Sequence, residues 1–75
     1  METLFNYNSR MAFGAGARHL SISKTENNRY VIQRGTPQQP SKSEFISLTE
    51  KEEEEIKSLQ NNAYNADYIE FVILR

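Results

Sequence analysis

Apolar and polar residues alternate over residues 18–35 of the chain. Leu20 and Ile22 alternate with serines, and residues 29–34 form a second run that is rich in β-branched and aromatic side chains. Period-2 alternation is typical of a strand with one buried face. Residues 25–28 lie between the two runs and are of types that suit a turn. The pattern therefore predicts a β-hairpin over residues 18–35.

The pattern changes to that of a helix over the acidic residues 49–60. Thr49 followed by Glu52 forms a Thr-x-x-Glu capping box, which marks a helix start. Apolar side chains then recur with helical spacing at Ile56, Leu59 and Ala63. This apolar stripe is narrow, so we expect the helix to contact a sheet along one edge and to leave most of its glutamates in solvent.

Two apolar runs flank this helix, at residues 44–48 and 68–74, and both read as strands. The second run is apolar on both faces: Ile69, Phe71 and Ile73 alternate with Tyr68, Val72 and Leu74. A strand of that kind is either central in a covered sheet or exposed at an interface. Since one helix covers only one face, we expect Tyr68, Val72 and Leu74 to contact the amino-terminal arm, a second subunit or a partner.

Together these elements predict a single α+β domain over residues 1–75. We expect a small, mostly antiparallel sheet of three to five strands with one helix packed on one face, in the order β-β-β-α-β. Residues 1–17 show no clear period; they read either as a short strand near residues 3–7 followed by an irregular arm, or as a mobile arm that docks on a partner. Residues 36–43 contain two prolines and read as an exposed loop.

Composition narrows the chemistry that the chain can support. The sequence has no cysteine and a single histidine, so disulfides and thiolate metal sites are excluded, and we expect no cofactor and no metal. A chain of 75 residues builds a marginal core. We therefore expect self-association or tight binding to another protein to supplement that core.

No pattern typical of an enzyme stands out. His19 has no identifiable partner for acid–base catalysis, and the serines lie in no nucleophile-elbow context. The four glutamates at 52–55 cannot converge on one cation, because consecutive side chains on a helix point about 100° apart. We expect no enzymatic activity and no catalytic residues.

The charges are unevenly distributed along the chain. Residues 1–42 carry six Lys/Arg and two acids, whereas residues 43–75 carry three Lys/Arg and eight acids. We expect a non-enzymatic protein-binding module, such as an inhibitor, adaptor or accessory factor, that is homodimeric and acts through a sheet face, the acidic helix or both. The helix residues expected to bind the partner are Glu53, Glu54 and Glu55.

The alternative function is nucleic-acid binding by the basic hairpin, through phosphate contacts and base stacking. Its candidate contacts are Arg18, Lys24, Arg29, Tyr30 and Arg34.

No apolar run approaches the roughly 20 residues of a membrane span, and residues 1–6 do not resemble a signal peptide. We therefore expect a cytoplasmic protein. A virus or mobile element is a natural source of so small a chain, and its compartment would then be the host cytoplasm.

Overall fold

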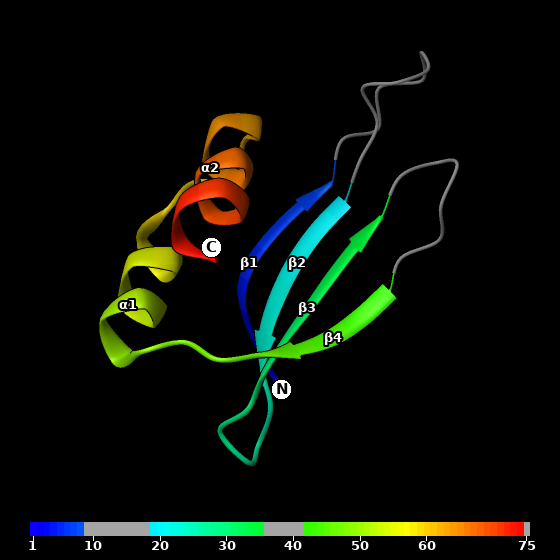
Figure 1. The fold of residues 1–75 in the computed structure, drawn as a ribbon, viewed down its shortest axis with the longest axis vertical. Coiled ribbons are helices and arrows are strands. Elements are labelled where there is room, and N and C mark those ends of the chain that lie inside the picture. Colours follow the sequence, from blue (N-terminus) through cyan, green and yellow to red (C-terminus); the bar gives the residue numbers. More distant parts are fainter. Residues whose placement is uncertain (9–18, 36–41, 75) are drawn as a thin grey trace.

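The computed structural model describes residues 1–8, 19–35 and 42–74 (Figure 1). Four strands form one antiparallel sheet in chain order, followed by two α-helices and a π-helical turn. The elements are β1 (Glu2–Asn8), β2 (His19–Lys24), β3 (Tyr30–Gly35), β4 (Lys42–Ile46), α1 (Glu50–Ser58), α2 (Ala63–Tyr68) and η2 (Ile69–Ile73). The predicted α+β class with a small antiparallel sheet is confirmed.

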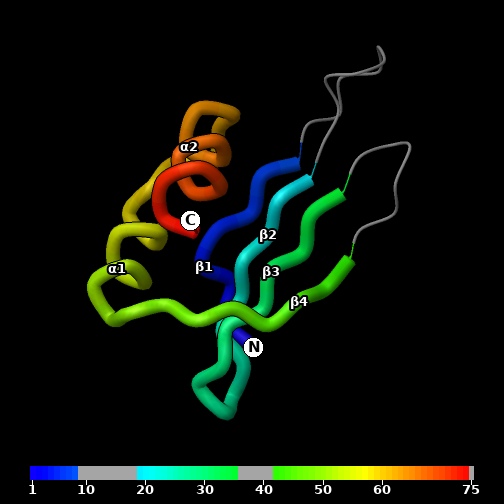
Figure 2. The backbone as a smooth tube through the Cα atoms, viewed as in Figure 1, coloured from blue at the N-terminus to red at the C-terminus, as the bar shows by residue number. Residues whose placement is uncertain are grey.

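The helices lie together at the β1 side of the sheet, and β4 forms the opposite edge (Figure 2). Among the described residues, eight make up the buried core, five from the strands and three from the helices: Leu4, Phe5, Leu20, Ile22, Ile32, Ile56, Ala66 and Ile69. We call the sheet face that contributes to this core the inner face.

The predicted hairpin is confirmed as β2 and β3. Ile22 lies directly opposite Ile32, and both are fully buried. The turn is held by hydrogen bonds from the Thr25 N–H to the Arg29 carbonyl (2.8 Å) and from the Asn28 N–H to the Thr25 carbonyl (3.0 Å). Asn28 has a φ of 62°, a left-handed conformation that asparagine tolerates better than most residues.

The strand expected near residues 3–7 is present as β1, and residues 9–17 of the expected arm lie outside the described residues. Phe5 lies in register with Ile22, and the register shifts between Thr3 and Phe5. Such an irregularity lets consecutive side chains share one face of the strand. Leu4 and Phe5 are therefore both buried, which gives the short strand two core residues.

The strand predicted over residues 44–48 is displaced toward the amino terminus. β4 begins at Lys42 and ends at Ile46, so it takes two residues from the predicted loop; residues 36–41 of that loop lie outside the described residues. Leu48 is half-buried against the core instead of continuing the strand. The chain has to leave the sheet here, because α1 begins two residues later.

The capping box of α1 is confirmed. The Glu52 N–H donates to the Thr49 hydroxyl (3.1 Å), and the Thr49 N–H donates to the Glu52 carboxylate (2.8 Å). The helix ends at Ser58, earlier than predicted, and the Leu59 N–H bonds the Ile56 carbonyl. Ala63 is therefore not part of the α1 stripe; it begins α2 and is exposed.

The final strand predicted over residues 68–74 is wrong, because this segment is helical. The Asn62 side chain caps α2 by accepting a hydrogen bond from the Asn65 N–H (2.8 Å), and the helix then runs into η2. The Leu74 N–H donates to the Ile69 carbonyl (2.9 Å), the i to i+5 bond of a π-helix. The observed order is thus β-β-β-β followed by helices, with two α-helices in place of one.

Helical spacing explains which side chains of this segment are buried. Ala66 and Ile69 are fully buried and Ile73 packs partly against the core, at i, i+3 and i+7. In the predicted strand, Phe71 would share the buried face with Ile69, yet its side chain is 64% exposed. β-propensity depends on the packing environment, and here a capped helix start overrides it.

Candidate functional site

A cluster of three polar side chains joins α1 to the inner face of the sheet. Lys24 and Tyr30 lie directly opposite each other on β2 and β3. The Lys24 ammonium is 3.1 Å and 3.3 Å from the two carboxylate oxygens of Glu53, and the Tyr30 hydroxyl donates to Glu53 Oε1 (2.5 Å). Glu53 is 7% exposed and is the one charged residue buried in the part of the chain that the structure describes. We call these three residues the clamp.

Helical spacing places Glu53 in the clamp. It lies one turn before Ile56, so both side chains point toward the sheet, and the carboxylate reaches the end of the β2–β3 hairpin. Burial of a carboxylate is costly unless it is paired and hydrogen-bonded. Two donors from neighbouring strands meet that requirement, and no buried side-chain nitrogen or oxygen among the described residues lacks a partner.

The pKa values of all three clamp residues are shifted away from pH 7. The hydrogen bond from Tyr30, followed by that from Lys24, lowers the pKa of Glu53 below its ordinary value of 4.5. The bond to Glu53 raises the pKa of Lys24 above 10.5 and the pKa of Tyr30 above 10.0. At neutral pH the cluster is therefore fixed as an ammonium, a neutral phenol and a carboxylate. This arrangement fits a structural contact between helix and sheet.

The acidic residues predicted to bind a partner do not form one surface. Glu53 is buried in the clamp, so it would reach a partner only if the clamp opened. Glu54 is exposed, and Glu55 is exposed but accepts a hydrogen bond from the Tyr68 hydroxyl (2.6 Å). This bond raises the pKa of Tyr68. Glu55 thus links α1 to α2.

The basic residues predicted to contact nucleic acid are similarly divided. Lys24 and Tyr30 are engaged in the clamp, and Arg18 lies outside the described residues. Arg34 is 3.8 Å from Glu44. The Arg29 guanidinium lies over the ring of Phe45, which is on the outer face of the sheet. The nucleic-acid alternative stays a prediction, and the clamp would have to open for Lys24 and Tyr30 to take part.

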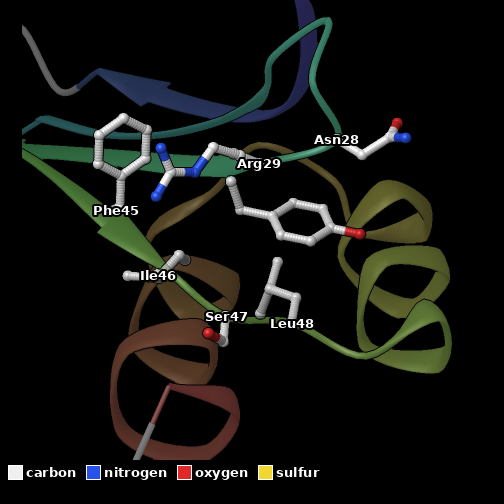
Figure 3. Close-up of a pocket in the computed structure, with 7 residues that line it drawn as sticks. Asn28, Arg29, Phe45, Ile46, Ser47 and Leu48 are labelled. Atoms are coloured by element: carbon white, nitrogen blue, oxygen red, sulfur yellow. The ribbon is translucent and has the colours of Figure 1, made fainter.

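A shallow groove lies where the chain leaves β4 toward α1 (Figure 3). Its volume is about 300 Å³, and it is lined by Asn28, Arg29, Tyr30, Phe45, Ile46, Ser47 and Leu48. The Arg29 guanidinium carbon is 4.3 Å from the centroid of the Phe45 ring, a cation–π distance, and the two side chains lie side by side in Figure 3. The groove combines an exposed aromatic ring with a cation.

A second apolar surface runs along α2 and η2, on the side away from the core. Helical spacing of i, i+4, i+7 and i+8 places its members together, and their exposed fractions are 86%, 36%, 64% and 55% for Tyr64, Tyr68, Phe71 and Val72. We call these four residues the helical stripe.

Sequence reasoning singled out Tyr68 and Val72 of the helical stripe and missed Tyr64 and Phe71. Leu74, which was grouped with them, packs partly against the core instead. The omission follows from the strand interpretation, which placed Phe71 on the opposite face from Tyr68. The helical spacing of the four residues was the available signal.

The remaining sequence candidates add no further cluster. His19 begins β2 and is half-buried. Within residues 1–8, 19–35 and 42–74, no group of three or more His, Cys, Asp or Glu side chains is arranged to hold a metal ion. In the same ranges no helix has the length and apolar character needed to cross a membrane.

Comparison of the chain with protein-family models, curated proteins and solved structures gives no match.

Proposed function

We propose that this chain is a non-enzymatic protein-binding module that docks on another protein through the helical stripe. The observation that carries the proposal is the exposure of Tyr64, Phe71 and Val72, each more than half exposed, on one side of α2 and η2. The opposite side of the same helices supplies Ala66 and Ile69 to the core. The segment is therefore anchored on one side and presents apolar groups on the other.

The size of the stripe supports this function. The three aromatic residues of the stripe are Tyr64, Tyr68 and Phe71. An aromatic side chain has about 150–250 Å² of surface, so their exposed fractions correspond to roughly 300–450 Å² of mostly apolar surface. A patch of that size is the largest found on a typical monomer and is often functional. It suffices for the centre of an interface of about 800 Å² per partner, with polar side chains around it.

Acidic side chains beside the stripe indicate the chemistry of the partner. Glu55 of α1 accepts a hydrogen bond from Tyr68, and the exposed Glu54 precedes Glu55 in the helix. A partner with an apolar groove flanked by Lys or Arg is complementary in both shape and charge. An inhibitor or adaptor role is compatible with such docking.

Binding to an identified partner tests the proposal by titration with purified proteins. Phe71→Ala removes a central ring, and we expect it to weaken binding by at least about thirtyfold, the effect of a hot-spot residue. Phe45→Ala is the matched control, because Phe45 is also a phenylalanine and is 62% exposed but lies on the sheet. Equal affinity of wild type and Phe71→Ala, with weakened binding by Phe45→Ala, would show that the groove and not the stripe is the docking surface.

A further inference from the structure

Strand β4 forms an open edge of the sheet in the part of the chain that the structure describes. It pairs with β3 alone, and the helices lie at the other side of the sheet, beside β1 (Figures 1 and 2). Four of its five residues are exposed. Every second residue of an edge strand points its N–H and C=O away from the sheet, where another strand can pair with it.

Within the described part of the chain, one of the two charged side chains of β4 has no ion pair. Lys42 lies directly opposite Arg34 on β3, and like charges in that position are unfavourable. Arg34 lies 3.8 Å from Glu44, whereas Lys42 forms no ion pair with any residue in the ranges 1–8, 19–35 and 42–74. The edge thus carries a cation that has no counter-charge among the described residues and, two residues later on the same face, an anion.

We propose that β4 pairs antiparallel with β4 of a second copy of this chain, about a twofold axis at Ser43, so that two sheets join into one. For two copies of one strand to pair antiparallel in a single sheet, the twofold axis must be perpendicular to the sheet. The inner faces of the two copies then lie on the same side of the joined sheet. Two residues that lie directly opposite each other in a sheet have side chains on the same face. The symmetric register is therefore centred on one residue, which lies opposite the same residue of the second copy.

Charge complementarity selects the register. Centring on Lys42 or on Glu44 places a charged residue opposite its own copy, which is repulsive. Centring on Phe45 places Glu44 opposite Ile46 and, because β4 ends at Ile46, leaves Lys42 with no carboxylate opposite it. Centring on Ser43 places Lys42 opposite Glu44 of the second copy, and the symmetry makes this contact twice.

This pairing supplies what the isolated sheet lacks. Each Lys42 gains a carboxylate, and each Glu44 lies between Arg34 of its own chain and Lys42 of the second copy. The contact is short, so the dimer belongs at the weak end of the interface range and dissociates as salt is added. The pairing is independent of the helical stripe, which stays free for another protein.

Charge reversal with sedimentation equilibrium tests the proposal, using the full chain over a concentration series. Lys42→Glu and Glu44→Lys each turn both contacts repulsive, and we expect the dimer dissociation constant to rise about tenfold or more. Mixing the two variants restores opposite charges in the heterodimer, so the mixture should associate like wild type. The double variant should also associate like wild type. Circular dichroism spectra that match wild type establish that both singly substituted chains fold.

Cross-linking tests the register separately, because the natural chain contains no cysteine. Ser43→Cys should form a disulfide-linked dimer under mild oxidation, since directly opposed residues have Cα atoms about 4.5–5.5 Å apart. Phe45→Cys is the matched control: in this register its two copies are separated by roughly 13 Å along the strands, too far for a disulfide.

Three outcomes would overturn the proposal. The first is a wild-type chain that remains monomeric at millimolar concentration. The second is a dimer that both single charge reversals leave intact, particularly if Phe71→Ala dissociates it, since the interface would then be the helical stripe. The third is efficient cross-linking of Phe45→Cys without cross-linking of Ser43→Cys, which would exclude the register centred on Ser43.

Discussion

Replacing Ile69 and Phe71 separately with alanine tests the helical packing of residues 68–74. Ile69 is fully buried, whereas Phe71 is 64% exposed two residues later. A strand would place both side chains on one face, and the observed helix places them on opposite sides. The two substitutions should therefore have very different effects on the free energy of unfolding.

The structure gives a magnitude for each. Ile69→Ala removes three buried carbon groups at about 0.8 kcal/mol each and leaves a cavity, so we expect a loss of about 2–5 kcal/mol. The whole domain is stabilised by roughly 4–11 kcal/mol at 0.05–0.15 kcal/mol per residue. Ile69→Ala should therefore lower Tm by at least about 10 °C. Phe71→Ala should change stability by less than about 0.5 kcal/mol, because alanine favours a helix and little packing is lost.

Urea denaturation followed by far-ultraviolet circular dichroism measures both free energies of unfolding. Equal slopes of the free energy against urea concentration show that the variants expose the same surface on unfolding. Val72→Ala is a control at a neighbouring position that is 55% exposed, and it should resemble Phe71→Ala. A loss for Phe71→Ala as large as that for Ile69→Ala would refute the helical packing and restore the strand.

Four further predictions test the local contacts. The pKa of Glu53 is lower in the folded protein than its ordinary value of 4.5, so the carboxylate contributes its full stabilisation above pH 4.5 and loses it as the pH falls through the folded-state pKa. In urea titrations between pH 6 and pH 2, the wild type should therefore lose more stability than Glu53→Gln. Thr49→Ala removes the α1 cap and should cost about 0.5–2 kcal/mol by the same assay, whereas Thr49→Ser should retain most of it. Asn28→Gly should be tolerated at a φ of 62° and Asn28→Val should lower Tm; equal Tm values would contradict the turn geometry. If the nucleic-acid alternative holds, fluorescence anisotropy should show oligonucleotide binding that weakens steeply with salt and is lost in the double variant Arg29→Ala/Arg34→Ala.

Local sequence signals were sufficient for the hairpin and for the start of α1. Asn28 lies among the turn residues, and the strands on either side alternate with period 2, so the turn and both strands are specified by neighbouring residues. Thr49 and Glu52 satisfy each other three positions apart, which is an interaction within one turn of chain. Contacts of this range can be read from the sequence without knowing the fold.

Residues 68–74 were ambiguous because their apolar positions fit two periods. Ile69 and Ile73 lie on one face of either a strand or a helix, and the positions of Phe71 and Leu74 distinguish the two. The helix is selected by the Asn62 cap and by the core position that Ile69 fills. That position is created by other elements of the fold, so the segment alone does not determine its own secondary structure.

Glu53 shows the same limit for the site. The run of glutamates predicts an acidic helix, and the glutamates in its first turn interact favourably with the helix dipole. The identical side chains at 53, 54 and 55 nevertheless have different environments in the structure. Glu53 meets Lys24 and Tyr30, which are 29 and 23 residues away in the chain, whereas Glu54 is exposed. The sequence determined the helix and its charge. The tertiary structure decided which carboxylate is buried, because only the packing of α1 against the sheet brings Lys24 of β2 and Tyr30 of β3 within reach of Glu53.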